Sequence, residues 1–389
     1  MRLLKIIPTL DPAYGGPVSG TLASSRIMAR EGCHTHFVTL DPPDAPWVAA
    51  CAFPVTAVGP GALSIGWTPT LGRWIAAHAG NFDVAVVHGI WSWASVGGGR
   101  ACKAAGLPYV LFTHGMLDPY FRQTKPVKHW IKQAFWLWQG PVLRDAHSVL
   151  FTAQAEADAA RGSFIGPRWR ERIVAYGTSG PPPGDPAPRI AAARQVIGLP
   201  DGPRYVLFLS RFHPKKGADV LVAAFARAAA DRPDLHLVLA GPDPEGLLPG
   251  LLAQGCAAGL EGRLHAPGAL SGDVKWGAFE GAKVFALITH QENFGIVLAE
   301  ALAAGTPVIT TDKTNIHAEL TATGAALICT DTADSAADAL TRYFALPACE
   351  VAEMRSRART AFAQSFTIEA AARDLLAVAR EAAAGEVVQ

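Results

Sequence analysis

The sequence has little of what marks a secreted, disulfide-bonded or membrane-spanning protein. Its six cysteines lie far apart with no CxxC pair, which is typical of reduced thiols rather than of a disulfide framework or a zinc site. No stretch approaches the roughly 20 apolar residues of a membrane span. The start, "MRLLKIIPTLDP", is broken by Pro8 and Asp11 and lacks the features of a signal peptide. We therefore expect a cytoplasmic protein.

An excess of one charge is also missing. The chain has 34 Lys and Arg against 33 Asp and Glu, a net charge of +1, which gives no overall attraction to nucleic acid and leaves only a local basic patch open. We expect no nucleic-acid partner. Half of the residues are hydrophobic and 17% are charged, and 389 residues are too many for one ordinary core. The composition predicts two domains of similar size.

Short β-type runs alternate with longer helical runs along the chain. "LLKIIPTL", "THFVTL", "FDVAVVHG" and "PYVLFTHG" form a first series, and "RYVLFLS", "LHLVLAG", "VFALITH" and "TPVITTD" form a second. This alternation predicts βα units on parallel sheets, that is, an α/β fold. The stretch "GPPPGDPAP" (180–188) can continue neither a helix nor a central strand, so we expect a linker there.

We therefore predict two Rossmann-like, doubly wound domains, residues 1–183 and 184–364, followed by a terminal helix over 365–389. Ligands of such sheets bind at the carboxyl ends of the strands. The expected site is a cleft between the two domains.

Two glutamates stand in the almost wholly apolar stretch "ITHQENFGIVLAEALAAGTPVI" (288–309). Glu292 precedes a predicted helix that begins near Ile296, and Glu300 lies inside it. Gly295 allows a tight turn, and the helix start offers free N–H groups and a positive dipole end. One interpretation has both carboxylates facing a ligand. The other makes Glu292 a dipole partner and Glu300 a solvated helix residue, which the apolar neighbours of Glu300 disfavour.

A second polar cluster lies in "LFLSRFHPKKG", where Arg211 and Lys216 follow a strand and precede a helix. Two cations at this place suit a diphosphate, with Arg as a planar fork and Lys as a point charge. Neighbouring Lys215 can be a solvated loop charge, and a purely structural role for the loop stays open.

The first half offers weaker signals. Gly15 and Gly16 follow the first strand and allow close approach to a substrate, but a plain turn explains them nearly as well. They do not form the GxGxxG pattern, which argues against a nicotinamide enzyme. His88 and His114 each end a strand and precede a glycine. A hydrogen-bonded core role and a role in the site both remain open for this pair.

The segment from Lys125 to Trp138 combines an apolar stripe with basic residues. The apolar residues at helical spacing are Val127, Ile131, Ala134, Phe135 and Trp138, and the basic ones are Lys125, Lys128 and Lys132. The favoured interpretation is a stripe packed in the core, with ordinary solvated lysines. The alternative is a helix that lies on an anionic membrane or meets a lipid-linked substrate.

The glutamate pair, the "SRFHPKKG" loop and the double α/β layout resemble the retaining nucleotide-sugar glycosyltransferases of the GT-B fold. More narrowly, the chain resembles the bacterial "group one" (family four) transferases of exopolysaccharide and lipopolysaccharide synthesis. "HQENFGIVLAEALAAGTPVI" and "THGMLDPY" are especially similar to the exopolysaccharide members. The resemblance covers nearly the whole chain.

The resemblance implies a role for each candidate residue. Glu292 would contact the transferred sugar, and Glu300 would contact the ribose hydroxyls. His114 would lie near the reacting sugar. Arg211 and Lys216 would bind the diphosphate. The donor would also be touched by Gly15, Gly16 and the amides of Phe294, Gly295 and Ile296. The terminal helix would cross back onto the first domain.

The expected activity is that of a hexosyltransferase with a nucleotide-diphosphate sugar donor and a glycan or lipid-linked acceptor. Fixed cations and a helix N-terminus can stabilise the departing diphosphate, and no DxD-type pair ends a strand, so we expect no metal and no other cofactor. In the retaining route of this fold the departing phosphate oxygen takes the acceptor's proton, and His114 would position and polarise. "VAYGTSG" replaces the family's usual Asn-Gly-Val turn, so contacts near Tyr176 and Gly177 should differ.

Three other functions fit parts of the pattern. A retaining glycosidase uses two carboxylates about 5 Å apart, but it does not need the separate cations. A sugar-nucleotide epimerase or a non-catalytic nucleotide-sugar-binding protein could share the whole layout.

Overall fold

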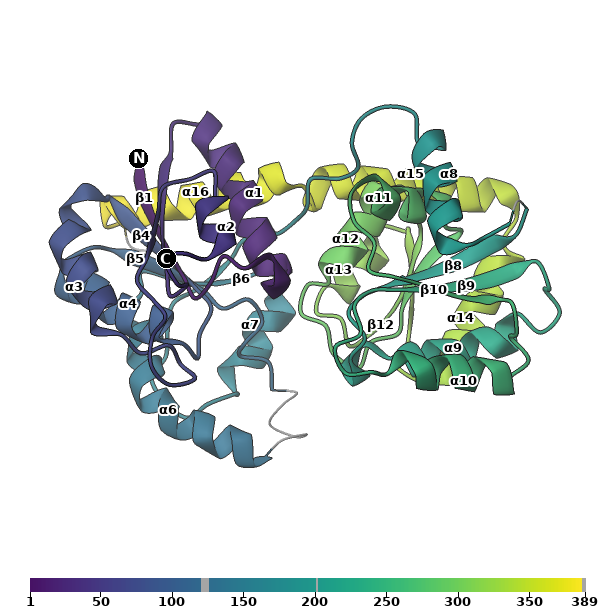
Figure 1. Ribbon diagram of the computed structural model, residues 1–389, viewed down its shortest axis with the longest axis horizontal. Helices are drawn as coiled ribbons and strands as arrows, with labels where there is room; N and C mark the ends of the chain where they lie inside the picture. Colours follow the sequence, from purple (N-terminus) through teal and green to yellow (C-terminus); the bar gives the residue numbers. More distant parts are fainter. Residues whose placement is uncertain (120–125, 201, 387–389) are drawn as a thin grey trace. The chain divides into compact units, whose positions relative to one another are not determined.

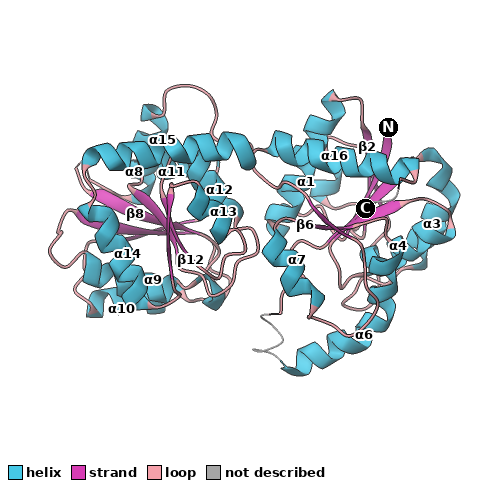
Figure 2. Ribbon diagram, turned by 180° about the vertical axis from the view of Figure 1, so that it is seen from behind, coloured by secondary structure: helices cyan, strands magenta, loops and turns pink. Residues whose placement is uncertain are grey.

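The computed structural model describes residues 1–119, 126–200 and 202–386 and divides into two compact units (Figure 1). The first unit is Met1–Gly177 with Ile368–Gln389, and the second is Thr178–Thr367. Each unit is a parallel sheet with helices on both faces (Figure 2). The second unit begins before residue 184, because Thr178 already pairs with Thr367 and donates its N–H to the Phe366 carbonyl at 3.0 Å.

The sheet of the first unit has the strand order β3-β2-β1-β4-β5-β6-β7. The strands are β1 (Arg2–Ile7), β2 (His34–Thr39), β3 (Val55–Ala57), β4 (Val84–His88), β5 (Tyr109–Phe112), β6 (Val149–Phe151) and β7 (Glu171–Ile173). The order reverses between β1 and β4, and such a switch point is where doubly wound sheets bind ligands. The central strands are buried along their length, as expected for a parallel sheet covered on both faces.

The helices of the first unit come from both ends of the chain. They are α1 (Gly16–Arg30), α2 (Pro46–Ala49), α3 (Pro69–His78), α4 (Trp93–Ala104), α6 (Pro126–Asp145), α7 (Gln154–Arg161) and α16 (Ile368–Ala384), with 3-10 turns η1 (Pro12–Tyr14) and η2 (Ala79–Asn81). Helix α16 packs on α1, β4 and β5. Its Leu375 and Leu376 join a buried cluster with Val86 and Val110. The expected return of the terminal helix to the first domain is confirmed.

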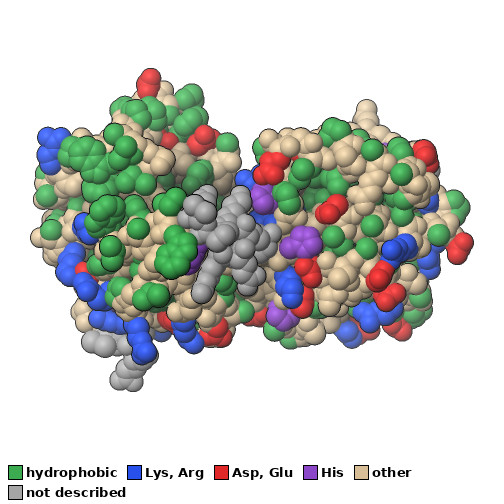
Figure 3. Space-filling model, turned by 90° about the horizontal axis from the view of Figure 1, so that it is seen from below, with side chains coloured by type: hydrophobic (Ala, Val, Ile, Leu, Met, Phe, Trp, Pro, Cys, Tyr) green, Lys and Arg blue, Asp and Glu red, His purple; other side chains and the backbone are tan. Residues whose placement is uncertain are grey.

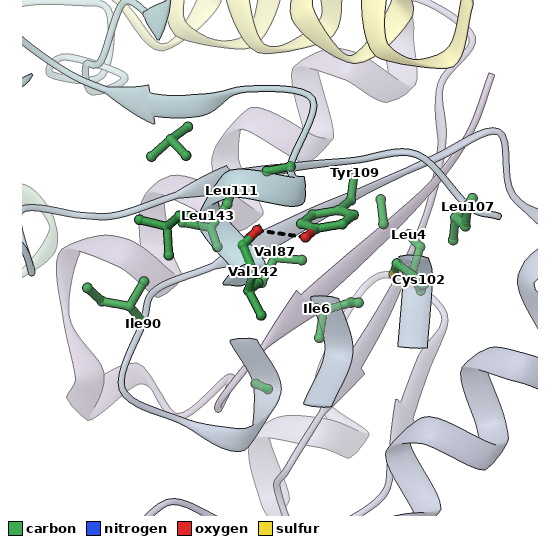
Figure 4. Packing of buried hydrophobic residues seen from close by; sticks show 14 of the residues in the cluster. Leu4, Ile6, Val87, Ile90, Cys102, Leu107, Tyr109, Leu111, Val142 and Leu143 are labelled. Carbon is green, nitrogen blue, oxygen red and sulfur yellow. Dashed lines mark hydrogen bonds between the residues drawn. The ribbon is translucent and has the colours of Figure 1, made fainter. Parts of the chain in front are cut away.

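The opposite face of this sheet holds the larger core (Figure 4). Leu4, Ile6 and Val87 of the sheet pack there with buried residues of α4 and α6. The hydroxyl of Tyr109 donates to the carbonyl of Val142 at 2.6 Å (Figure 4), which satisfies the polar end of a buried aromatic side chain. The carboxyl-terminal half of α6 is thus fastened to β5.

The middle of α6 does not follow the favoured expectation of a stripe packed in the core. Ile131 is 66% exposed and Trp138 is 55% exposed. The helix instead buries the neighbouring stripe, in which Trp136 stacks on Phe164 with ring centroids 4.8 Å apart. Lys132 is not simply solvated, since its ammonium lies 4.6 Å from the Trp91 ring centroid. Lys125 and the side chains of 126–128 lie outside the described residues.

The sheet of the second unit has the order β10-β9-β8-β11-β12-β13, so its switch point lies between β8 and β11. The strands are β8 (Arg204–Leu209), β9 (Leu235–Ala240), β10 (Leu264–Gly268), β11 (Val284–Leu287), β12 (Val308–Thr311) and β13 (Ala326–Cys329). The helices are α8 (Ala187–Ile197), α9 (Ala218–Ala228), α10 (Leu248–Ala257), α11 (Gly272–Gly281), α12 (Ile296–Ala303), α13 (His317–Ala322), α14 (Ala333–Ala345) and α15 (Ala348–Ser365), with the 3-10 turn η3 (Pro214–Lys216).

Candidate functional site

The loops that follow β8 and β11 are packed together at the switch point of the second sheet. The carbonyl of Lys215 accepts hydrogen bonds from the His290 N–H and the Thr289 hydroxyl, both at 2.8 Å. A Cβ at Gly217, whose φ is +60°, would lie 1.8 Å from the Ile288 carbonyl oxygen, so only glycine allows this approach. The Lys215 ammonium donates to Gln291 Oε1 at 3.3 Å and is therefore not simply a solvated loop charge.

This packing brings together two of the predicted residues, Lys216 and Glu292. The Lys216 ammonium donates to Glu292 Oε2 in an ion pair, and the two side chains are only 12% and 11% exposed. Glu292 Oε1 accepts the Asn293 N–H at 3.1 Å. The backbone of Glu292 is fixed by hydrogen bonds to Lys313 and Asn315, each 3.0 Å. A buried carboxylate is tolerable here because a cation and an amide pair with it.

Arg211 lies on the same loop but in a different environment. It follows β8 after Ser210 and precedes Phe212, which is fully buried and stacks on Phe208. The Arg211 side chain is exposed and makes no hydrogen bond or ion pair with the part of the chain that the structure describes. Its guanidinium is therefore available to an anion in a way that the Lys216 ammonium is not.

Glu300 is held by a partner that the sequence did not indicate. The Lys275 ammonium of α11 donates to Glu300 Oε1 at 2.7 Å and lies 4.7 Å from the Trp276 ring centroid. Glu300 is 8% exposed, so the interpretation of a solvated helix residue is wrong. Its Oε2 has no hydrogen-bond partner among the described residues, so it can accept hydrogen bonds from a ligand.

The helix start between these glutamates has the predicted form. Gly295 precedes α12 with φ +70°, and a Cβ there would lie 2.9 Å from Glu292 Cγ. No side chain caps the helix. The Leu298 N–H donates to the Gly295 carbonyl at 2.8 Å, and the N–H groups of Ile296 and Val297 are left for a ligand or solvent. Phe294 is 5% exposed and its ring packs on Phe366. Only its backbone is therefore suited to contact a ligand.

In the first unit, one of the two glycines after β1 has a backbone conformation that favours glycine. Gly15 has φ +77° and precedes α1, which begins at Gly16. A Cβ at either position would meet nothing within 4 Å. The turn therefore requires glycine at Gly15 for its backbone conformation, whereas Gly16 is not constrained by its surroundings.

The two predicted strand-end histidines are in direct contact. Nδ1 of His88 lies 3.1 Å from Nε2 of His114, and the rings stack at 5.3 Å with an interplanar angle of 16°. His114 is half-buried and has φ +51°, a left-handed conformation. Burial, followed by the charge of Lys5, lowers the pKa of His114 to about 3. Burial likewise holds the pKa of His88 well below its usual range, so both rings are neutral near pH 7.

Within residues 1–119, 126–200 and 202–386, no group of three or more His, Cys, Asp or Glu residues is arranged to hold a metal ion. The described helices include none that is both long and apolar enough to cross a membrane.

Both units correspond to domains of known families. Residues 15–177 match the model of the glycosyl transferase 4-like domain, and residues 190–362 match that of the glycosyl transferases group 1. The solved structure of HepE from Anabaena, in complex with UDP and glucose, covers 97% of this chain and 99% of its own, with a TM-score of 0.75 and 19% identity. The fold is thus the GT-B fold. Each unit is similar to a glycosyltransferase domain, and the second unit matches the group 1 model.

Curated relatives match over shorter stretches. A phosphatidyl-myo-inositol mannosyltransferase of Mycolicibacterium smegmatis is 34% identical over 173 residues, which is 44% of this chain and 42% of the relative. A D-inositol 3-phosphate glycosyltransferase of Thermobispora bispora is 39% identical over 132 residues, 32% of this chain and 30% of the relative. The chain thus spans less than half the length of the curated relatives it matches.

Proposed function

We propose that the protein is a retaining hexosyltransferase that moves a sugar from a nucleotide-diphosphate donor to a glycan or lipid-linked acceptor. The observation that carries this proposal is the site of the second unit. There the Lys216–Glu292 ion pair and the start of α12 follow the strands at the switch point, and exposed Arg211 lies on the same loop as Lys216. The family and the UDP and glucose bound by HepE support the donor class.

The chemistry of the donor explains this combination of groups. Departure of a nucleoside diphosphate builds negative charge, which Arg211, Lys216 and the α12 N-terminus stabilise in the transition state. Glu292 accepts hydrogen bonds from the transferred sugar, and Glu300 accepts them from the ribose through its free oxygen. The amides near Gly295 contact the sugar and the distal phosphate. No step requires a metal or another cofactor.

His114 acts as a hydrogen-bond donor rather than as a general base. A ring whose pKa is about 3 has little affinity for a proton near pH 7, and an efficient base needs a pKa close to the working pH. In the retaining route the departing phosphate oxygen takes the proton of the acceptor hydroxyl on the same face of the sugar. His114 polarises the sugar, and Gly15 and Gly16 approach the donor.

A panel of nucleotide sugars incubated with and without candidate acceptors tests the proposal. Transfer predicts nucleotide release that depends on acceptor, and retention predicts a product with the donor's anomeric configuration by NMR. Interconversion of the sugar without release would instead indicate an epimerase. Binding without turnover would indicate a binding protein, and release of sugar from a glycan without nucleotide would indicate a glycosidase.

The acceptor belongs to cell-surface polysaccharide or glycolipid synthesis, at the cytoplasmic side of the membrane. The relatives whose names contain inositol support a lipid or polyol acceptor. Membrane contact is supported by exposed apolar residues on and beside α6 in the first unit. We call these residues the α6 surface: Trp130, Ile131, Leu137, Trp138 and Ile165. Figure 3 shows hydrophobic patches beside Lys and Arg side chains on one face of this unit.

The α6 surface has the chemistry of an interfacial contact. Trp is favoured at the level of lipid headgroups, and the loop that carries Ile165 also carries exposed Arg168 and Arg170, which complement an anionic surface. Gln133 ties this loop to α6 by donating to the Ile165 carbonyl at 3.0 Å. The apolar and basic groups are therefore held together.

Sedimentation with anionic vesicles tests this contact. Wild-type protein should pellet with vesicles that contain phosphatidylglycerol, and less with neutral ones. Changing Trp130, Ile131 and Trp138 to Ser should release it, whereas Val196→Ser, at a residue of α8 that is 51% exposed, should not. Equal pelleting of the triple variant and wild type would exclude the α6 surface as the membrane contact.

A further inference from the structure

His88 ends β4 at the switch point of the first sheet and is 2% exposed. Its Nδ1 faces two polar atoms, His114 Nε2 at 3.1 Å and Thr21 Oγ1 at 3.4 Å. Its Nε2 is buried and has no hydrogen-bond partner among the residues that the structure describes. The two nitrogens of His88 thus have very different surroundings.

This difference selects one arrangement of the protons. Both rings are neutral, so exactly one nitrogen of each ring carries a hydrogen. If His114 donated from Nε2, the hydrogen of His88 would sit on its buried Nε2, where it has nothing to donate to. An unpaired buried N–H is costlier and rarer than an unpaired acceptor. The hydrogen of His88 therefore belongs on Nδ1, which donates to His114 Nε2.

We propose that His88 is a positioning residue that holds His114 in its Nδ1–H tautomer and aims that N–H at the substrate. The inference rests on the proposed function, in which His114 donates a hydrogen bond to the reacting sugar. Nδ1 of His114 has no hydrogen-bond partner within the described residues, and the His114 side chain is only half-buried. The nitrogen that His88 leaves protonated is thus the one that the described protein groups leave without an acceptor.

The surroundings of His114 hold the ring in this arrangement. Its ring stacks on Phe112 at 4.4 Å and 12°, which opposes rotation. The strained backbone of His114, at φ +51°, is fixed through the residues before and after it. Glu156 Oε1 accepts from the Gly115 N–H at 3.0 Å and from the Thr113 hydroxyl at 3.1 Å. A ring held by stacking, backbone and one hydrogen bond is preorganised for donation.

The first test needs no substrate. The ring nitrogens of His114 can be observed by ¹⁵N NMR in histidine-labelled full-length protein, with the His114→Gln variant to assign the signals. We expect a protonated Nδ1 and an unprotonated Nε2 at pH 7. A protonated Nε2 in the wild type would overturn the inference, whatever the enzyme transfers.

The second test uses three variants of His88. Asn places its amide N–H close to the position of Nδ1, Gln places it close to Nε2, and Leu removes the donor. His88→Asn should keep the His114 tautomer and stay within about threefold of the wild-type kcat. His88→Leu and His88→Gln should lose the tautomer and about 3- to 10-fold in kcat, the range of one neutral hydrogen bond, with KM for the donor nearly unchanged.

The outcomes separate the two levels of the proposal. Equal kcat and equal His114 signals in the Asn, Gln and Leu variants would show that His88 does not position His114. If the signals change as expected but His114→Ala transfers sugar at the wild-type rate, the role of His114 in the proposed function fails while the tautomer assignment stands. Thermal unfolding of each variant identifies any that does not fold, and the wild-type spectrum decides the tautomer without them.

Discussion

Lys216 and Glu292 form a nearly buried ion pair that joins the loops after β8 and β11. The sequence suggested these residues as separate contacts, the lysine for the diphosphate and the glutamate for the sugar. Their contact means that, without donor, the lysine charge is balanced by the carboxylate. A bound diphosphate must share the ammonium with Glu292, whereas exposed Arg211 needs no such rearrangement. The two cations should therefore respond differently to mutation.

Glu292→Gln keeps the size of the side chain and removes its charge. We expect kcat to fall by about 10- to 100-fold, as for the loss of a hydrogen bond to a charged group. Affinity for the free nucleoside diphosphate should be kept or raised, because Lys216 is no longer shared. Calorimetry with the diphosphate and kinetics with the sugar donor measure both. Glu319→Gln, at an exposed residue of α13, is the control, and a loss of diphosphate affinity in Glu292→Gln alone would refute the assignment.

Lys216→Met should destabilise the fold, because it leaves the Glu292 carboxylate buried without its cation. Removal of one partner of a buried pair costs about 3–5 kcal/mol. The double variant Lys216→Met/Glu292→Gln should recover most of this unfolding free energy but not the transfer activity. Urea unfolding of the two single variants and the double variant gives the coupling between them. Additive losses would show that the ion pair has no part in stability.

Arg211→Ala should leave the free energy of unfolding within about 0.5 kcal/mol of wild type, since the side chain is exposed and makes no hydrogen bond or ion pair with the described residues. The fold decrease in kcat should exceed the fold increase in KM for the sugar donor, because charge on the leaving diphosphate grows in the transition state. Arg373→Ala, at an exposed position of α16, controls for loss of a surface cation. An unchanged kcat/KM would remove Arg211 from the site.

Glu300 and Lys275 should act as a unit in binding the nucleotide. Glu300→Gln should raise KM more than it lowers kcat, because a ribose contact is nearly the same before and during reaction. Lys275→Met should also raise KM more than it lowers kcat, since the Lys275 ammonium, 2.7 Å from Glu300 Oε1, orients the Glu300 carboxylate. The double variant should bind the diphosphate no more weakly than Glu300→Gln. Additive losses in calorimetry would mean that the lysine contacts the donor independently.

The residues that could be predicted are those whose position follows from topology alone. Alternating βα units place Arg211, Lys216 and Glu292 after neighbouring parallel strands, so they had to share one edge of the sheet. Gly295 could be predicted for the same reason, because tight turns end strands and begin helices. Of the two strand-end histidines, His88 is the last residue of β4 and His114 follows β5, and these strands are adjacent.

The features that were missed depend on tertiary packing. Lys275 reaches Glu300 only because α11 packs against α12, and no spacing in the sequence links two different helices. The repeat at Ile131 and Trp138 indicates a stripe on α6, but not that the loop at Phe164 covers the neighbouring stripe instead. A helical period fixes which residues share a face, and only the surrounding chain decides which face is buried.

We expect transfer without a metal ion because of the charges of the site. Arg211, Lys216 and the N–H groups at the start of α12 can together offset the charge that develops on a departing diphosphate. We expect acceptor-dependent nucleotide release to continue at an unchanged rate in excess EDTA, with no stimulation by added Mg²⁺ or Mn²⁺. Activity that chelator abolishes and either ion restores would contradict this.

Lys5 gives the fold a distinctive dependence on pH. It lies in β1 with 0% exposure, and its amine donates to Ser25 Oγ at 2.8 Å and to the Thr21 carbonyl at 3.4 Å. Burial lowers its pKa from 10.5 to about 7. Between these two values the unfolded chain binds a proton that the folded protein does not. The free energy of unfolding therefore rises with pH across that window, and below pH 7 the full cost of the buried charge is present.

Lys5→Met removes this group while keeping an unbranched side chain of similar length. The unfolding free energy of wild type relative to Lys5→Met should increase by on the order of 3 kcal/mol from pH 7 to pH 10. Urea unfolding of both proteins at each pH unit measures the difference, from which titrating groups that do not interact with Lys5 cancel. Lys103→Met, whose side chain is 58% exposed, should show no comparable trend. A constant difference between wild type and Lys5→Met would mean that Lys5 titrates alike in the folded and unfolded chain.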